Sequence, residues 1–211
     1  PPVDDQIKMI VAGVNDHKLT PEDCIISNAS CTTNNAAPML KLLHDAFQIE
    51  QAYITTVHSY TTDQSLHDQP HNDLRRARAA GQSIVPTTTG AAKALTKLFP
   101  DLNNVIGGCG IRVPVANGSL CDITLNVKKK ASIQKVNTLF EKAANGSLKG
   151  ILQYTQDPIV SIDIVGNTHS CVLDSEMTSV IGKMIKIIGW YDNETGYSSR
   201  IIDLMYKMSR K

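Results

Sequence analysis

The spacing of apolar residues along the chain predicts four amphipathic helices. Apolar positions recur at helical spacing over residues 33–47, and Ser30 is placed to cap the first turn of that helix. The same pattern predicts a short helix over 91–98, a helix that runs from a Ser132 cap to Gly146, and a last helix over 196–208. The first of these places Cys31 at a helix N-terminus.

Short runs rich in β-branched and aromatic residues predict strands between these helices. The predicted strands span residues 7–14, 24–27, 52–59, 105–115, 120–128, 159–164, 170–173 and 184–190. Strands and helices alternate only irregularly, and the later strands follow one another at short range. The pattern therefore favours an α+β fold with a mixed, largely antiparallel sheet and helices packed on one face.

Two other segments stand out from this pattern. Residues 60–77 are polar and show no clean period, which predicts a long ordered loop of the kind that often carries function. The glycine-rich run at 107–110 lies ahead of a strand-like segment instead of a helix. We expect it to form a bulge or a close approach between backbones.

Composition narrows the class of protein. The 211 residues, of which 42% are apolar, suffice for one main domain. The 21 basic and 20 acidic residues nearly balance, which argues against nucleic acid or an anionic membrane surface as a partner. No apolar run is long enough to cross a bilayer. The five cysteines form no C-x-x-C pair, which argues against a disulfide framework or a metal site and favours a cytoplasmic setting.

Cys31 and His58 are the candidate nucleophile and base. A thiol at a helix N-terminus lies at the positive end of the helix dipole, which stabilises the reactive thiolate. His58 stands near the end of the next predicted strand, where its imidazole could take the thiol proton and later move protons to and from a bound intermediate. The alternative is that both residues are structural, as most cysteines and histidines are.

Two features near this pair predict binding of an anion. Thr89 and Gly90 precede the predicted helix over 91–98, so a hydroxyl and free backbone amides could hold an anion there. Arg112, on a predicted strand, could supply a fixed positive charge. A nucleophile, a base and two anion sites together suggest a phosphorylated substrate.

Six segments of the chain resemble the phosphorylating glyceraldehyde-3-phosphate dehydrogenases of the bacterial and chloroplast type. They occur in the order of the family over nearly the whole chain, and span residues 27–34 (SNASCTTN), 58–61 (HSYT), 73–80 (DLRRARAA), 89–94 (TGAAKA), 112–114 (RVP) and 190–194 (WYDNE). The resemblance implies an enzyme that oxidises and phosphorylates D-glyceraldehyde 3-phosphate with NAD through a cysteine thioester. It also implies a glycolytic, cytoplasmic homotetramer as the full-length parent.

The resemblance further implies how the chain is divided. Residues 1–30 would be the tail of the NAD-binding domain, 31–193 the catalytic domain, and 194–211 a helix that packs on the NAD-binding domain. No Gly-x-Gly-x-x-Gly turn between a strand and a helix occurs in the sequence, so most of the Rossmann NAD domain is expected to be missing. The chain alone is then expected not to turn over.

The resemblance assigns roles to individual residues. Cys31 and His58 would be catalytic, with the Cys31 backbone amide and the imidazole stabilising charge on the substrate oxygen. The remaining site residues fall into three groups, with no metal ligand among them: Thr61 and Arg112 for the substrate phosphate, Ser30, Thr32, Thr89 and Gly90 for the attacking inorganic phosphate, and Asn193 and Tyr197 for the nicotinamide.

The sequence differs from the family at some positions, and other functions remain alternatives to this assignment. Asn35 stands where the family commonly has a second cysteine, Thr195 replaces the common tryptophan, and Pro70 is the residue that NAD-specific members carry. Erythrose-4-phosphate dehydrogenase shares the cysteine and histidine segments, although residues 89–93 fit the glyceraldehyde enzyme better. A non-catalytic binding protein of the same fold and a thiol hydrolase are the rivals from other classes.

Overall fold

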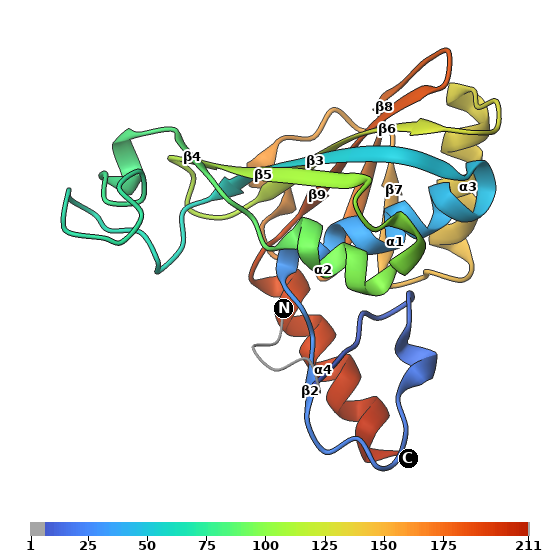
Figure 1. The fold of residues 1–211 in the computed structure, drawn as a ribbon, viewed down its shortest axis with the longest axis horizontal. Coiled ribbons are helices and arrows are strands. Elements are labelled where there is room, and N and C mark those ends of the chain that lie inside the picture. The colour runs from blue at the N-terminus through green and yellow to red at the C-terminus, as the bar shows by residue number, and fades with distance from the viewer. Residues whose placement is uncertain (1–6, 211) are drawn as a thin grey trace.

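A seven-stranded sheet forms the centre of the computed structural model, which describes residues 7–210 (Figure 1). Across the sheet the strands are β4 (Val85–Thr87), β5 (Ile106–Val113), β3 (Ile49–Ser59), β6 (Ser119–Val127), β9 (Met184–Tyr191), β8 (Cys171–Ile181) and β7 (Leu152–Thr155). Two neighbouring pairs, β3 with β5 and β7 with β8, are parallel, and the other four are antiparallel. The predicted mixed, largely antiparallel α+β sheet is confirmed.

Three helices cover one face of this sheet: α1 (Cys31–Phe47), α2 (Ala91–Leu98) and α3 (Ile133–Asn145) (Figure 1). β6 alternates buried and half-buried residues along its whole length, which is the two-residue period of a strand with one face in the core. Ile123 on β6, Leu40 on α1 and Phe140 on α3 are fully buried in one apolar cluster. Burial of this cluster fixes α1 against the centre of the sheet.

The first turn of α1 determines where Cys31 lies. Ser30 has extended backbone dihedrals, and its Oγ accepts a hydrogen bond from the Thr33 N–H at 3.1 Å, so it is the N-cap that the sequence predicts. The helix begins at Cys31, two residues before the predicted start, and continues through Pro38 to Phe47. Cys31 is therefore the first residue of the helix, as expected.

β3 brings the other candidate catalytic residue beside Arg112. This central strand pairs with β5 in parallel, and the register sets His58 directly across from Arg112. The strand begins at Ile49, three residues before the predicted start. From Ser59 the chain leaves the sheet in the long loop that the sequence predicts, and Figure 1 shows this loop reaching beyond the edge of the sheet.

Some predicted strands are wrong or shortened. Residues 159–164 contain a 3₁₀ helix, Ser161–Ile164, in which the Asp163 carboxylate accepts a hydrogen bond from the Val160 N–H. Of residues 7–14, only β1 (Lys8–Met9) pairs, because the Asn15 side chain then bonds the backbone of Met9 and Val11 and turns the chain. Strands β4 and β7 were not predicted. The other 3₁₀ helices are Asp16–Lys18, Ala80–Gln82 and Pro100–Leu102.

The glycine run at 107–110 lies inside β5, and the pairing with β3 shows no bulge there. The close approach is confirmed instead. A Cβ added at Gly107 would lie 2.9 Å from the Tyr53 ring, and one at Gly108 would lie 2.9 Å from the carbonyl oxygen of Ile54. Glycine at these positions therefore lets β5 lie beside β3, and so sets Arg112 beside His58.

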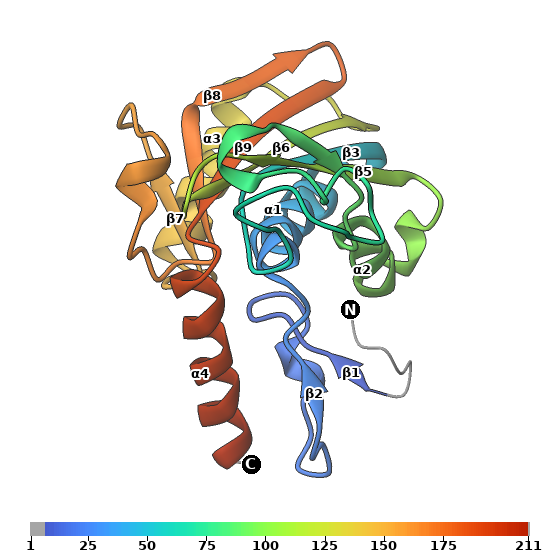
Figure 2. The ribbon, with the colours of Figure 1, turned by 90° about the vertical axis from the view of Figure 1, so that its left-hand side faces the viewer.

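The last helix, α4 (Thr195–Ser209), leaves the sheet and lies beside the N-terminal segment (Figure 2). That segment contains the parallel pair of β1 and β2 (Ile26–Ser27), and Leu204 of α4 packs against its Ile10 and Leu19. Residues 1–6 and 211, which belong to the predicted tail and final helix, lie outside the described residues. No helix among residues 7–210 combines the length and apolar character needed to cross a membrane.

Candidate active site

A cavity of about 200 Å³ opens at the N-terminus of α1, between β3, β5 and the segment that leads into α2. Its lining combines the candidate nucleophile and base with side chains and backbone suited to anions. Seven of the ten predicted site residues line it: Cys31, His58, Ser30, Thr32, Thr89, Gly90 and Arg112. Four parts of the chain that are far apart in sequence thus converge on one small polar cavity.

Cys31 and His58 are in direct contact within this cavity. The Cys31 Sγ lies 3.4 Å from the His58 Nε2, and only 5% of His58 is exposed. The His58 Nδ1 lies 2.7 Å from the carbonyl oxygen of Ser59. When the imidazole proton is on Nδ1, it is donated to this carbonyl oxygen and the Nε2 lone pair is directed at the sulfur. This is the arrangement that a general base requires.

Arg112 holds its positive charge against the same imidazole. The Arg112 Nη1 donates to the Ser59 carbonyl oxygen at 2.9 Å and lies 2.6 Å from the His58 Nδ1. Burial and then the charge of Arg112 lower the pKa of His58 to about 4. The imidazole is therefore neutral near pH 7 and able to accept a proton.

The thiol is held in its neutral form more firmly than the helix dipole alone predicts. Burial raises the pKa of the Cys31 thiol above its ordinary value, although hydrogen bonds from Thr32 and the charge of Arg112 act to lower it. The helix dipole predicts a thiolate in the resting state, but burial favours the neutral thiol. The resting pair is a thiol beside a neutral imidazole, and the nucleophile forms when the proton moves from Sγ to Nε2.

Tyr191, at the end of β9, contacts both α1 and β3 beside the pair, although no role was predicted for it from the sequence. Its hydroxyl lies 3.0 Å from the Thr32 Oγ1 and 2.8 Å from the Thr56 Oγ1. Its ring meets the His58 imidazole edge to face, with centroids 5.9 Å apart. Tyr191 therefore ties the first turn of α1 to β3, which limits how far the sulfur and the imidazole can separate.

Ser30 and Thr89, each at the start of a helix, also line the cavity. The Thr89 Oγ1 accepts from the Ala91 N–H at 3.2 Å, and Gly90 is the residue before α2 begins. Ser30 is the N-cap of α1, whereas the N-cap of α2 is Gly90 and Thr89 bonds the first residue of that helix. Both helices therefore direct an N-terminus, which is favourable to an anion, at the cavity.

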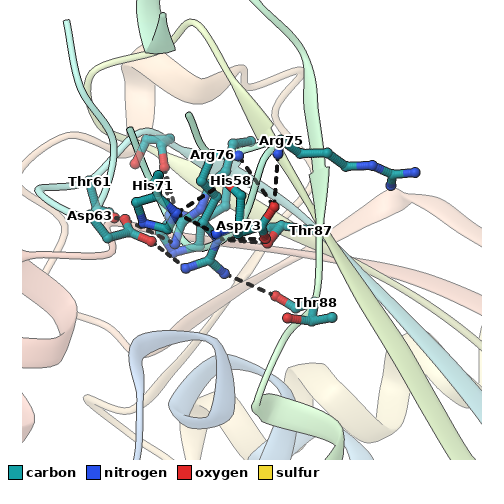
Figure 3. Close-up of polar contacts among 11 residues, drawn as sticks. His58, Thr61, Asp63, His71, Asp73, Arg75, Arg76, Thr87 and Thr88 are labelled. Atoms are coloured by element: carbon teal, nitrogen blue, oxygen red, sulfur yellow. Dashed lines mark hydrogen bonds and ion pairs between the residues drawn. The ribbon is translucent and has the colours of Figure 1, made fainter. Parts of the chain in front are cut away.

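Thr61 lies outside the cavity lining but is linked to Arg112 through Asp63. The Thr61 hydroxyl donates to the Asp63 carboxylate. That carboxylate accepts from the Arg76 Nη1 at 2.6 Å (Figure 3). It also lies 3.8 Å from the Arg112 Nη2. Arg76 lines the cavity, and sequence reasoning missed it because its charge is one of several in the loop.

Asn193 and Tyr197 lie near the pair but not in the cavity lining. The Asn193 side chain is buried, and its Oδ1 accepts from the Ser59 hydroxyl at 2.8 Å and the Ser119 hydroxyl at 2.9 Å. These two bonds fix the plane of the amide. Tyr197 is half-buried at the start of α4, and burial followed by the nearby Cys31 raises the pKa of its hydroxyl.

Comparison with known proteins places this site in a family. The family profile for the glyceraldehyde 3-phosphate dehydrogenase C-terminal domain matches residues 30–193, which include nine of the ten predicted site residues. The chain belongs to the glyceraldehyde-3-phosphate dehydrogenase family. The match covers the sheet and the three helices that pack on it, and it agrees with the family that the sequence motifs indicate.

Individual relatives support the same conclusion. The chain is 52% identical over 210 residues to the glyceraldehyde-3-phosphate dehydrogenase of Borreliella burgdorferi, which covers 98% of this chain and 63% of that protein. It is 52% identical over 204 residues to the Mycobacterium leprae enzyme, covering 97% of the chain and 60% of the relative. For glyceraldehyde-3-phosphate dehydrogenase 1 of Streptomyces avermitilis the identity is 50%, with 96% and 61% covered. The chain thus spans about three fifths of these relatives.

Proposed function

We propose that this chain is the catalytic domain of an NAD-dependent enzyme that oxidises and phosphorylates D-glyceraldehyde 3-phosphate to 1,3-bisphosphoglycerate. The observation that carries the proposal is the 3.4 Å contact between the Cys31 Sγ and the His58 Nε2, in a cavity that also contains Arg112 and the N-terminus of α2. A nucleophile, its base and two anion-binding groups within one hollow fit a phosphorylated aldehyde.

In the first step His58 takes the thiol proton and the sulfur attacks the aldehyde carbon. The carbonyl oxygen becomes negative as the carbon–sulfur bond forms, and it takes up a proton to give a hemithioacetal. Donors placed in advance stabilise this charge best, and the N-terminus of α1 supplies backbone amides at the sulfur. The substrate phosphate is proposed to lie against Arg112 and Thr61.

The second step removes the hydroxyl proton of the hemithioacetal, for which the His58 Nε2 is the base within reach. Oxidation of that carbon to a thioester also needs a hydride acceptor, which is the chemistry that NAD supplies when bound. Asn193 and Tyr197 are proposed to hold its nicotinamide. A carboxamide partner fits Asn193, because two serine hydroxyls already fix the plane of its own amide.

Release of the product requires a second anion. An inorganic phosphate oxygen attacks the thioester carbon, the carbon–sulfur bond breaks, and the thiol is restored with a proton returned from His58. Ser30, Thr32, Thr89 and Gly90 are proposed to hold the attacking phosphate, because they line the same cavity as Cys31. In the full-length parent we propose a homotetramer in the cytoplasm.

The proposed substrate can be tested on this chain without cofactor, because hemithioacetal formation blocks alkylation of Cys31. D-Glyceraldehyde 3-phosphate should protect Cys31 from iodoacetamide at concentrations at least about 10-fold lower than glyceraldehyde without the phosphate, since charge-assisted bonds to Arg112 are lost with the phosphate. Protection is measured by mass spectrometry of the Cys31 peptide over a concentration series of each aldehyde.

The matched variants are Arg112→Gln and Arg78→Gln. Arg78 is an exposed loop residue paired with Asp68, so its replacement should leave the preference for the phosphorylated aldehyde intact, whereas Arg112→Gln should remove it. Equal protection by both aldehydes in the unaltered chain would reject a phosphorylated substrate. Stronger protection by erythrose 4-phosphate than by glyceraldehyde 3-phosphate would favour the erythrose-4-phosphate dehydrogenase alternative.

A further inference from the structure

The anion-binding arginines of this site already hold an anion that the chain itself supplies. The Asp63 carboxylate accepts from the Arg76 Nη1 at 2.6 Å through one oxygen, while its other oxygen faces the Arg112 Nη2 at 3.8 Å and accepts from the Thr61 hydroxyl. Figure 3 shows the Asp63 carboxylate beside Thr61 with the Arg76 guanidinium next to it. The partners of Asp63 are thus the groups suited to a phosphate.

The charges around the pocket show what a phosphate would have to replace. Two guanidinium groups, those of Arg76 and Arg112, face the carboxylates of Asp63 and Asp73, the second of which lies 3.6 Å from the Arg76 Nε. The two positive and two negative charges of these four side chains sum to zero. Arg75 does not change the balance, because its side chain extends away from the cluster (Figure 3). An incoming dianion therefore competes with a carboxylate for the same donors.

Partial burial makes this competition strong. The side chains of Arg112, Arg76 and Asp63 are 15%, 22% and 34% exposed, so their interactions are only partly screened by water. Burial acts to raise the pKa of Asp63, but the Thr61 hydroxyl and the charges of Arg112 and Arg76 outweigh it and lower the pKa. Asp63 is therefore ionised near pH 7 and occupies the site as a charge.

We propose that Asp63 is an internal competitor of the phosphate ligand, which holds Arg76 and Arg112 in place when the pocket is empty and must release them when phosphate binds. The inference rests on the proposed function, because it concerns the same phosphate pocket. Asp63 is then a residue that sets affinity and specificity. It weakens binding of every anion, and it disfavours a monoanion relative to a dianion, because a monoanion only restores the single charge that the displaced carboxylate supplied.

The geometry also links this competition to the base. Arg112 lies between Asp63 and His58. Its Nη2 faces the Asp63 carboxylate, and its Nη1 contacts the His58 Nδ1. An anion that replaces Asp63 at Arg112 changes the charge beside the imidazole. Occupancy of the pocket and the proton affinity of His58 are therefore coupled, so phosphate binding is expected to shift the imidazole signals of His58.

The test is the affinity of the 211-residue chain for inorganic phosphate, measured by NMR of the arginine Nε–H signals at pH 7.5 and constant ionic strength. Asp63→Asn should bind phosphate about 10-fold more tightly than the unaltered chain, because the competing charge is gone while the side chain keeps its size. Asp63→Glu, which keeps the charge, should not tighten binding. Asp45→Asn makes the same change of charge at an exposed position on α1 and should have no effect.

A structural role for Asp63 predicts the opposite result. If Asp63 serves only to position the arginines, Asp63→Asn binds phosphate as weakly as the unaltered chain or more weakly, and the proposal is overturned. Should Asp63→Asn fail to fold, Asp63→Ser replaces it with the same expectation. Arg112→Gln tests the proposed function separately: if the Arg76 Nε–H signal responds to phosphate in this variant as it does in the unaltered chain, Arg112 does not hold the phosphate and the substrate-phosphate pocket fails as well.

Discussion

Cys31→Ser is expected to abolish acylation of this chain at its active site. In the unaltered chain the Cys31 sulfur attacks the carbonyl carbon of a small activated ester such as p-nitrophenyl acetate, the thiol proton moves to the His58 Nε2, p-nitrophenolate leaves, and a thioester remains. A serine hydroxyl at the same place is far harder to ionise beside this base. The rate of acylation at residue 31 should fall at least about 10³-fold.

The measurement is the burst of p-nitrophenolate together with mapping of the acetylated peptide. Cys109→Ser is the matched control, because Cys109 is a half-buried thiol on β5 that has Thr55, not a histidine, beside its sulfur. Its replacement should leave the burst unchanged. A burst of full size in Cys31→Ser, or acylation spread evenly over the exposed cysteines of the unaltered chain, would show that Cys31 is not the nucleophile.

His58 should make the folded chain sensitive to mild acid. Its pKa is about 4 in the folded chain, chiefly because it is buried, and about 6.5 in an unfolded one. Below pH 6.5 the unfolded chain binds a proton that the folded chain does not, so the contribution of neutral His58 is complete above pH 6.5 and is lost as the pH falls toward 4. At pH 5 the loss amounts to about 2 kcal/mol in the free energy of unfolding.

The test compares urea unfolding at pH 7 and pH 5 in the unaltered chain and in His58→Gln, which cannot take up the proton. The decrease in unfolding free energy between the two pH values should be about 2 kcal/mol smaller in the variant. His17→Gln removes an exposed histidine far from the cavity and serves as the control. The same decrease in all three chains would mean that His58 is not held in its neutral form.

The sequence predicted well those features that follow from local pattern. The N-cap at Ser30, the helix that begins at Cys31 and the strand that carries His58 all depend on residues within one element, and each lies where the pattern places it within a few residues. Seven predicted site residues also line one cavity. Their convergence came from family motifs, because no local rule states that β3 and β5 pair with His58 opposite Arg112.

The features that were missed depend on contacts and exposure that the pattern of residue types does not show. The predicted strand at 159–164 is apolar in sequence, but Ile162 is 71% exposed and the segment closes on its own Asp163. β7 is short and pairs only with β8, so its sequence carries little signal. Arg76 and Tyr191 were overlooked for the same reason, since their roles arise from Asp63 and from Thr32, which only the fold brings near.

The central claim is that Cys31 and His58 act as one unit, and the pH dependence of alkylation tests it most directly. Moving the proton from Cys31 to His58 does not change the number of protons on the pair. The fraction of molecules in which it has moved is therefore independent of pH between the pKa of His58 and that of Cys31. We expect the rate at which iodoacetamide alkylates Cys31 to be nearly constant from about pH 5.5 to 8, whereas the rate for an ordinary exposed thiol falls about tenfold for each unit that the pH is lowered below its pKa.

The measurement is made for each cysteine by mass spectrometry, in the unaltered chain and in His58→Gln. Cys121 and Cys171 are fully buried, and burial raises the pKa of Cys121 to about 12, so they report on unfolding. His58→Gln is expected to remove the constant rate and to give Cys31 the steep pH dependence of an ordinary exposed thiol. A Cys31 profile that already has this steep dependence in the unaltered chain, or a constant rate that persists without His58, would mean that the two residues do not act as one unit.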